Sequence, residues 1–385
     1  MRVLCYTQNL VGVGHFVRML AIARGLGAAH EVHLVDGGRA VPHRGGPYDP
    51  RLVTLPRLIR QDGRLTAEDP GRSLAETLAE RSARLSEATA RIRPQVLLVD
   101  HYPFSRWELD REITDTIATA RRVVADVSVV CSVRDNLWSH FRTTTQDAYE
   151  QGVLARLDAC FDRLLIHTDP AFWQLEEAFG RAGEITVPRH YTGIVVDREP
   201  APPVAPEPEP YAVLSCGGST TNLGFLLAAI EAFRRLRARG AVGRMPLLVF
   251  PGPVGEADHA ALQRAIGDGP GRLFGFSPDF PAWLASSALS ISRAGYNTCG
   301  QILAAGTRSI LVPNPENADQ APRARRLAKL GLATVVEREP LDAEAIASAV
   351  VTALAAPPGR HTLDLEGVPA TRAMLEQPRL VAKAR

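Results

Sequence analysis

The sequence predicts an α/β protein with two doubly wound domains, each built on a parallel sheet. Its 385 residues exceed the size of one typical domain, about 100–200 residues. Short apolar runs alternate with amphipathic helical segments on both sides of a proline-rich stretch. The runs are continuously apolar, which is typical of strands buried on both faces of a parallel sheet. They lie at 2–7, 96–100, 129–133, 163–168, 211–216, 246–252, 288–292 and 309–313.

The proline-rich stretch predicts the domain boundary. Residues 196–210 hold six prolines and four acids, a composition that forms neither a helix nor a central strand. We therefore expect an N-terminal domain at 1–197, a stiff linker at 198–210 and a C-terminal domain at 211–385. The weakly amphipathic tail from about 370 to 385 is expected to return to the N-terminal domain, where it could be helical.

Both predicted domains begin with a strand, a pair of glycines and a helix. Gly12 and Gly14 follow strand 2–7, and Gly217 and Gly218 follow strand 211–216. Apolar residues at 3–4 spacing predict a helix after Gly14 and further helices at 73–92, 145–160, 223–238 and 319–330. Ligands of such sheets bind outside the carboxyl ends of the strands, where the strand order reverses. The sequence therefore predicts one ligand site in each domain.

Composition and charge exclude several classes of protein. The net charge of +2, with both signs interspersed, argues against a nucleic-acid partner, and the excess of arginine over lysine is a compositional bias. The five cysteines are scattered and form no C-x-x-C pair, which argues against disulfides and zinc knuckles. No apolar run approaches the ~18 residues of a membrane helix. We expect a cytoplasmic protein without an integral membrane segment or metal, and nothing indicates its oligomeric state.

Two glycine turns are candidate ligand loops. In G-V-G-H-F-V-R, Gly12 to Arg18, a helix start offers free N–H groups to an oxyanion and keeps the imidazole of His15 neutral, as a general base requires. A capping or core histidine explains His15 alone equally well, and Asp36 leaves a dinucleotide site open by spacing. In C-G-G-S-T-T-N, Gly217, Gly218 and Ser219 offer donors to a phosphate, or Ser219 is only a helix cap.

The most specific motif is the block from Ser292 to Gln320. An arginine ends one strand, a glycine turn exposes amide and hydroxyl donors, and an Asp-Gln pair heads the helix after the next strand. Such a set on adjacent strand ends can hold a diphosphate, a ribose and sugar hydroxyls in order. The residues are Arg293, Gly295, Asn297, Thr298, Gln301, Asp319 and Gln320.

With these motifs in place, the chain resembles a GT-B glycosyltransferase. It is similar to the MurG-like family 28 enzymes that transfer N-acetylglucosamine, and closer still to a bacterial group of predicted glycosyltransferases. The resemblance rests on G-x-G-H-x-x-R, the G-G-S turn, the Arg293–Gln320 block, L-V-D-H-Y-P-F-S-R-W-E-L (98–109), C-S-V-R-D-N-L (131–137), Y-T-G (191–193) and F-G-F (274–276).

The resemblance implies two Rossmann-like domains that face a central cleft, with the nucleotide-sugar on the C-terminal one. Gly217, Gly218, Ser219 and the 293–298 turn would meet the diphosphate, the Phe276 backbone the base, and Asp319 and Gln320 the sugar. Gln301 stands where the MurG-like pattern has a glutamate that grips the ribose, so the nucleotide stays open. The acceptor would contact Gly14, Arg18, Arg134 and Asp135.

The expected activity is metal-independent, inverting transfer of a sugar from a nucleotide-diphosphate donor, with a UDP-sugar favoured. No D-x-D occurs, so helix starts and an arginine would replace a metal, and no cofactor is expected. His15 is the expected base, with Asp100 as its catalytic partner and Asp135 or Glu108 as alternates. The expected acceptor is the hydroxyl of a small natural product or nucleoside.

Two other functions stay open at this point. G-x-G-H-x-x-R also resembles a hydrolase of sialic-acid-like sugar synthesis, so a nucleotide-sugar hydrolase or epimerase is the alternative, and a non-catalytic binding protein is a third. The Gly/Pro-rich region 40–72 is expected to be a mobile loop over the acceptor. Five aromatic residues near the site could stack on an acceptor, although core or rim positions are the commoner outcome: Tyr102, Phe104, Trp107, Trp138 and Phe141.

Overall fold

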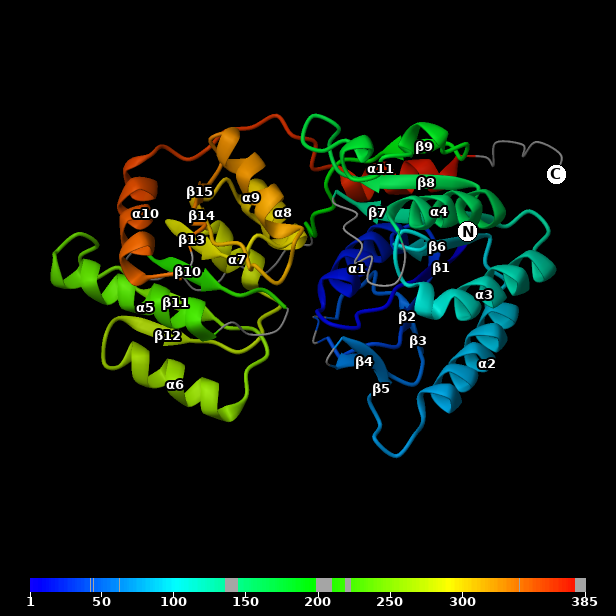
Figure 1. Ribbon diagram of the computed structural model, residues 1–385, viewed down its shortest axis with the longest axis horizontal. Helices are drawn as coiled ribbons and strands as arrows, with labels where there is room; N and C mark the ends of the chain where they lie inside the picture. Colours follow the sequence, from blue (N-terminus) through cyan, green and yellow to red (C-terminus); the bar gives the residue numbers. More distant parts are fainter. Residues whose placement is uncertain are drawn as a thin grey trace. The chain divides into compact units, whose positions relative to one another are not determined.

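A computed structural model of the protein describes residues 1–41, 43, 45–61, 63–135, 145–198, 210–218, 223–338 and 340–377. The chain divides into two compact units (Figure 1). The first consists of Met1–Val41, Gly45–Asp197 and Leu363–Arg385, and the second contains Arg198–Thr362. Most of the predicted linker lies outside the described residues. Each unit is a doubly wound α/β domain, which confirms the predicted fold class.

The first unit is built on a seven-stranded parallel sheet with the order β3-β2-β1-β6-β7-β8-β9. All residues of β6 and β8 are buried, which explains the apolar runs Val96–Val99 and Leu164–Ile166 within them. The order reverses between β1 and β6, so their carboxyl ends form the switch point of this sheet. The strands are β1 Arg2–Tyr6, β2 Glu31–Asp36, β3 Arg51–Thr54, β6 Val96–Asp100, β7 Ser128–Arg134, β8 Arg163–His167 and β9 Arg189–Tyr191.

Helices cover the first sheet, and one of them comes from the end of the chain. The helix α11 packs against α1, with Val368 of α11 against Gly25 of α1, and Arg163 of β8 donates to the carbonyl of Gln377. The chain thus returns to the first unit from Leu363, a few residues before the tail from about 370 that the sequence expects to return to this domain. The helices are α1 Gly14–Gly27, α2 Leu74–Ile92, α3 Asp110–Val123, α4 Gln146–Cys160 and α11 Gly367–Glu376, with short 3-10 turns η1 Trp107–Leu109, η2 Leu175–Glu177 and η3 Ala182–Glu184.

The expectation of a mobile loop at 40–72 is wrong for its central part. Besides β3, this region forms a small antiparallel hairpin of β4 Leu58–Gln61 and β5 Arg64–Ala67, which Gly63 turns with φ +77°. Leu55 and Leu58 are fully buried in the core of the first unit. These two leucines anchor the segment despite its polar and glycine-rich composition.

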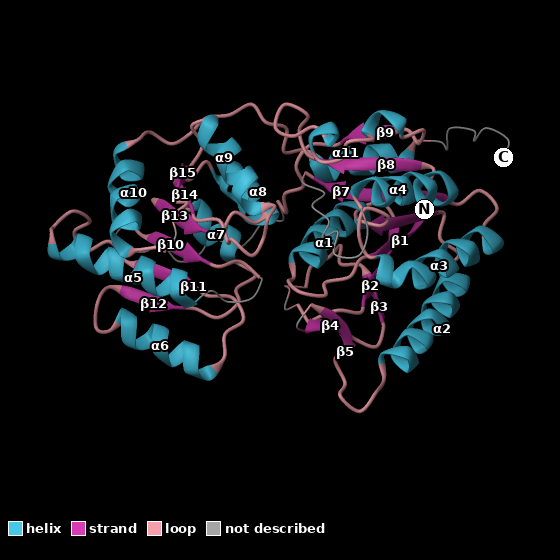
Figure 2. Cartoon of the chain, in the orientation of Figure 1, coloured by secondary structure: helices cyan, strands magenta, loops and turns pink. Residues whose placement is uncertain are grey.

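The second unit repeats the plan with a six-stranded parallel sheet (Figure 2). Its order is β12-β11-β10-β13-β14-β15, which places the switch point between β10 and β13. The strands are β10 Ala212–Ser215, β11 Leu247–Phe250, β12 Gly271–Leu273, β13 Leu289–Ser292, β14 Ser309–Leu311 and β15 Thr334–Val335. The helices are α5 Leu223–Ala238, α6 Glu256–Ile266, α7 Phe280–Ala285, α8 Tyr296–Ala305, α9 Gln320–Lys329 and α10 Ala343–Ala355.

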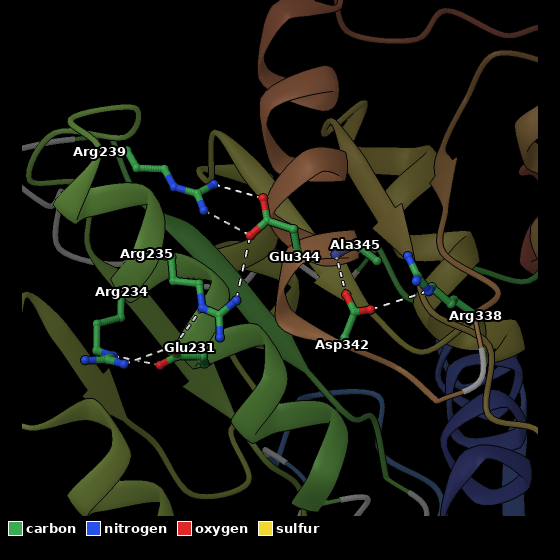
Figure 3. Close-up of polar contacts among 8 residues, drawn as sticks. All are labelled: Glu231, Arg234, Arg235, Arg239, Arg338, Asp342, Glu344 and Ala345. Carbon is green, nitrogen blue, oxygen red and sulfur yellow. Dashed lines mark hydrogen bonds and ion pairs between the residues drawn. The ribbon is translucent and has the colours of Figure 1, made fainter.

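The helices α5 and α10 pack side by side and share a network of exposed charges (Figure 3). Arg239 donates to both carboxylate oxygens of Glu344 at 2.9 and 3.1 Å, and Asp342 caps α10 by accepting from the Ala345 N–H at 2.7 Å. Water screens such charges, so the network contributes little to stability. None of the helices in the described ranges combines the length and the hydropathy needed to span a bilayer.

Candidate functional site

The first unit brings His15 and Asp100 together at its switch point. His15 is the second residue of α1, which follows β1, and Asp100 is the last residue of the neighbouring strand β6. Nδ1 of His15 lies 2.8 Å from Oδ2 of Asp100, with the imidazole 15% exposed and the carboxylate fully buried. The predicted base and its predicted partner therefore form a hydrogen-bonded pair, which we call the dyad.

Two further side chains hold the carboxylate of the dyad. The hydroxyl of Thr7 donates to Oδ2 of Asp100 at 2.8 Å, and Arg18 forms an ion pair with Oδ1. Burial alone would raise the pKa of Asp100, but His15 and Arg18 bring it well below its ordinary value. The ionised carboxylate can accept the Nδ1–H of a neutral imidazole, which leaves Nε2 of His15 with a lone pair for a proton.

The electrostatic surroundings favour the neutral form of His15. Burial lowers its pKa to about 4, and the positive charges of Arg106 and Arg134 act in the same direction, while Asp100 opposes them. A neutral imidazole at pH 7 that is oriented by a carboxylate has the form of a general base. The local geometry thus suits proton abstraction from a bound hydroxyl group.

The residues predicted to contact the acceptor and the predicted alternative bases differ in how they lie relative to the dyad. Gly14 precedes His15 at the start of α1, and Arg18 is buried against Asp100. Arg134 ends β7, the strand next to β6, and Asp135 after it is 2% exposed. Glu108 forms an exposed ion pair with Arg60 of the β4–β5 hairpin instead of joining the dyad.

Sequence reasoning missed His101, which directly follows Asp100. Its ring lies edge-on to that of His15, with 4.8 Å between centroids and 81° between planes. Ligand atoms of His15, Asp100 and His101 lie within 4.8 Å of one another, close enough to consider a metal ion. Arg18 already neutralises the carboxylate, and Arg106 and Arg134 add positive charge, so these surroundings disfavour a cation.

The second unit brings its two glycine turns together at the matching switch point. Gly217 and Gly218 follow β10, and Gly295 precedes α8 after β13. A Cβ atom placed on Gly217 would lie 3.7 Å from Oγ1 of Thr298, and one on Gly295 would lie 3.9 Å from the same atom. Thr298 therefore stands between the two turns, and Ser219 lies outside the described residues.

Three residues predicted to bind the donor tie the strand ends of the second unit together. Arg293 stacks on Phe225 with 4.3 Å from its Cζ to the ring centroid, and it donates to the carbonyls of Val312 and Pro313 at 2.9 Å. The carboxamide oxygen of Gln320 accepts from the N–H groups of Ala294 and Asn314 at 3.2 and 3.0 Å. Asp319 pairs with the buried Arg323 at 2.9 Å. These contacts give all three residues a structural part, and their contacts with a donor stay predictions.

The remaining predicted residues occupy the same edge of the sheet or lie apart from it. Asn297 and Gln301 are half-buried on α8, and Phe276 beyond β12 is 38% exposed. Tyr102 and Phe104 are core residues of the first unit, and Trp107 stacks on Tyr149. Trp138 and Phe141 lie outside the described residues.

Comparison with known proteins identifies the second half of the chain. Residues 216–362 match the glycosyltransferase family 28 C-terminal domain. A relative in Synechococcus sp. (strain CC9902) is 38% identical over 105 residues, 27% of each chain, and one in Rhodopseudomonas palustris (strain BisB5) is 35% identical over 158 residues, 35% of this chain and 43% of that one. Both are named UDP-N-acetylglucosamine–N-acetylmuramyl-(pentapeptide) pyrophosphoryl-undecaprenol N-acetylglucosamine transferase. The matches thus span less than half of these relatives.

Solved structures share the fold of the whole chain. The glycosyltransferase of kitacinnamycin has a TM-score of 0.60 and covers 97% of this chain, with 94% of its own chain covered. VinC in complex with DTDP has a TM-score of 0.59 and covers 98% of this chain, with 94% of its own chain covered. MurG of Acinetobacter baumannii has a TM-score of 0.52 and covers 97% of this chain, with 94% of its own chain covered. Each is 16% identical, a level that establishes the fold alone. Together these comparisons show the GT-B fold for the chain and a family 28 C-terminal domain match for residues 216–362.

Proposed function

We propose that the protein transfers a sugar from a nucleotide-diphosphate donor, preferably a UDP-sugar, to a hydroxyl group of a small acceptor, with inversion and without a metal. The observation that carries this proposal is the His15–Asp100 dyad at the switch point of the first unit. The family 28 domain match to residues 216–362 supports a donor site in the second unit.

The dyad supplies the proton chemistry of the proposed reaction. Nε2 of His15 accepts the proton of the acceptor hydroxyl while its oxygen bonds to the anomeric carbon and the bond to the nucleotide diphosphate breaks. Asp100 stabilises the imidazolium that forms, and Thr7 and Arg18 keep the carboxylate in place. Backbone N–H groups of the Gly217–Gly218 turn and of the start of α8 would stabilise the departing diphosphate.

The nucleotide is proposed to be UDP because both relatives above are named for a UDP-sugar. The structure of VinC in complex with DTDP supports dTDP as a second candidate nucleotide. Gln301 also leaves the nucleotide open, because its amide lacks the charge with which a glutamate would bind the ribose. A thermal-shift panel of UDP, dTDP, GDP and ADP separates them, because a ligand that binds only the folded state raises the Tm. UDP should give the largest rise, and a larger rise with dTDP would replace it.

The acceptor is proposed to be a small natural product or nucleoside. The glycosyltransferases of kitacinnamycin and of spinosyn, which share the fold over 97% and 98% of this chain, support this class. The names of the two relatives favour a second candidate, a pyrophosphoryl-undecaprenol acceptor of cell-wall synthesis. Parallel assays with a small-molecule library and with a short-chain lipid-linked muramyl pentapeptide decide between them, and transfer to the lipid-linked compound alone would exclude the first class.

Replacement of the base tests the reaction itself. In His15→Ala we expect turnover to fall about 10²–10⁴-fold, the usual contribution of a general base, with the UDP-induced rise in Tm retained. Unchanged turnover would contradict the assignment of His15. Release of free sugar without acceptor would favour a nucleotide-sugar hydrolase, formation of an isomeric sugar would favour an epimerase, and binding without turnover would favour a regulatory protein.

A further inference from the structure

The position of His101 is unusual for the residue that follows a strand. Adjacent residues of a strand point to opposite faces, so an extended backbone would direct His101 away from the face that Asp100 occupies. Both side chains nevertheless lie beside His15. The backbone of His101 is left-handed, with φ +59°, and this conformation turns its ring back toward the dyad.

The left-handed backbone conformation occurs twice in the turn after β6. Three non-glycine residues in the described ranges have a left-handed backbone, and two of them, His101 and Arg106, lie in this turn, while Arg93 is an ordinary helix C-cap. The N–H of His101 donates to the carbonyl of Ser132 at 2.8 Å, and the carbonyl of His101 accepts from Ser105 at 2.9 Å. Strain that neighbours hold in place is typical of functional sites.

The ring of His101 acts by packing. It is 6% exposed, it meets His15 edge-on, and its buried Nε2 has no hydrogen-bond partner among the described residues. A hydrogen bond from this nitrogen therefore does not orient the ring. The ring instead covers one side of the His15 imidazole, and we call it the wall.

We propose that His101 is a positioning residue for His15, which it keeps dry and correctly oriented toward Asp100. The proposal rests on the proposed role of His15 as the base. The charged groups that act on His15 include Asp100 at the end of β6, Arg106 before η1 and Arg134 at the end of β7. Arg18 of α1 acts on Asp100, and both of these charges act on the titratable ring of His167 in β8. Burial is the largest cause that lowers the pKa of His15, so the proposal predicts that removal of the wall raises it.

Two variants of the full chain test whether the ring of His101 shields His15 from water or only supports the fold. His101→Asn removes the ring and suits a left-handed backbone, whereas His101→Phe keeps a ring of similar shape. Histidine NMR titration of the unliganded protein, with the His15 signal assigned by its loss in His15→Gln, measures the pKa of His15 directly. We expect the pKa to rise from about 4 toward 6.5 in His101→Asn and to stay low in His101→Phe.

The outcome of the titration does not depend on the donor or the acceptor, so it fails separately from the proposed function. An unchanged pKa of His15 in folded His101→Asn, checked by circular dichroism, would overturn the proposal even if His101→Phe does not fold. Where transfer is measurable, a rise to 6.5 would lower kcat/KM about tenfold at pH 5.5 and leave it unchanged at pH 8.5, because only the neutral base accepts a proton. Equal losses at both pH values would also contradict a role through His15.

Discussion

The two sheets have the same strand order on both sides of their switch points, yet the residues at those points differ. In the first unit, the buried ion pair of Asp100 and Arg18 meets the partly buried imidazole of His15 after β1 and β6. In the second unit, Arg293 and Gln320 face backbone carbonyl and N–H groups, and glycine turns meet around Thr298. The first edge therefore presents reactive side chains, and the second uses side chains to hold a backbone surface in shape. Substitutions at the first edge should change kcat, and those at the second should change stability and the KM for the donor.

The largest effect is expected from Asp100→Asn. The amide cannot stabilise an imidazolium as a carboxylate does, and it leaves the buried charge of Arg18 uncompensated, so kcat should fall about 10²–10⁴-fold. Asp110→Asn is the matched control, because Asp110 also pairs with an arginine, Arg156 at 2.7 Å, but is partly exposed and bonds to Arg156 and Tyr102 rather than to His15. Steady-state kinetics of both variants check this, and equal losses would show that the dyad has no special part.

The pH dependence should show the low pKa of the same imidazole. With a pKa of about 4, His15 stays neutral on lowering the pH to about 5, and kcat/KM should fall by half near pH 4. The pKa of His15 in the folded state lies below its unfolded value of 6.5, so this group contributes stability above pH 6.5 that is lost as the pH falls toward 4. Initial rates and circular dichroism at each pH separate the two effects. An acid limb at pH 6–7 would mean that the base is solvated or is another group.

A smaller effect is expected from Gln320→Ala in the second unit. The buried N–H groups of Ala294 and Asn314 lose their acceptor, which costs about 1–3 kcal/mol of unfolding free energy and loosens the 293–298 turn. Tm should fall and the KM for the donor should rise, with kcat at saturating donor retained. Gln263→Ala is the control, since this exposed glutamine of α6 takes no part in that network and is not among the predicted donor residues. A fall in kcat without a fall in Tm would mean that Gln320 takes part in the reaction itself. It would contradict the difference described above between the two switch points.

The sequence predicts the sheets better than it predicts these roles. Continuous apolar runs identify β6 and β8, whereas β3 to β5 are short and polar and escape the pattern. The sequence predicts that the amphipathic tail returns to the N-terminal domain, but not that the return begins as early as Leu363. His101 was missed because strand alternation points it away from Asp100, and only its φ angle reverses that. The structural contacts of Arg293 and Gln320 could not be predicted, because a sequence does not show which backbone groups lie within their reach.

The smallest effect is expected from Glu344→Gln in the exposed network between α5 and α10. Arg239 lies 2.9 Å from Glu344, almost the distance that joins His15 to Asp100, so distance alone predicts similar importance. The two sites differ in burial: the side chains of Arg239 and Glu344 are 55% and 51% exposed, while that of Asp100 is fully buried. Because water and salt screen exposed charges, Tm should change by less than about 2 °C and kcat should not change. Thermal unfolding at low and high salt checks this, and a large salt-sensitive loss would mean that burial is not what separates the two pairs.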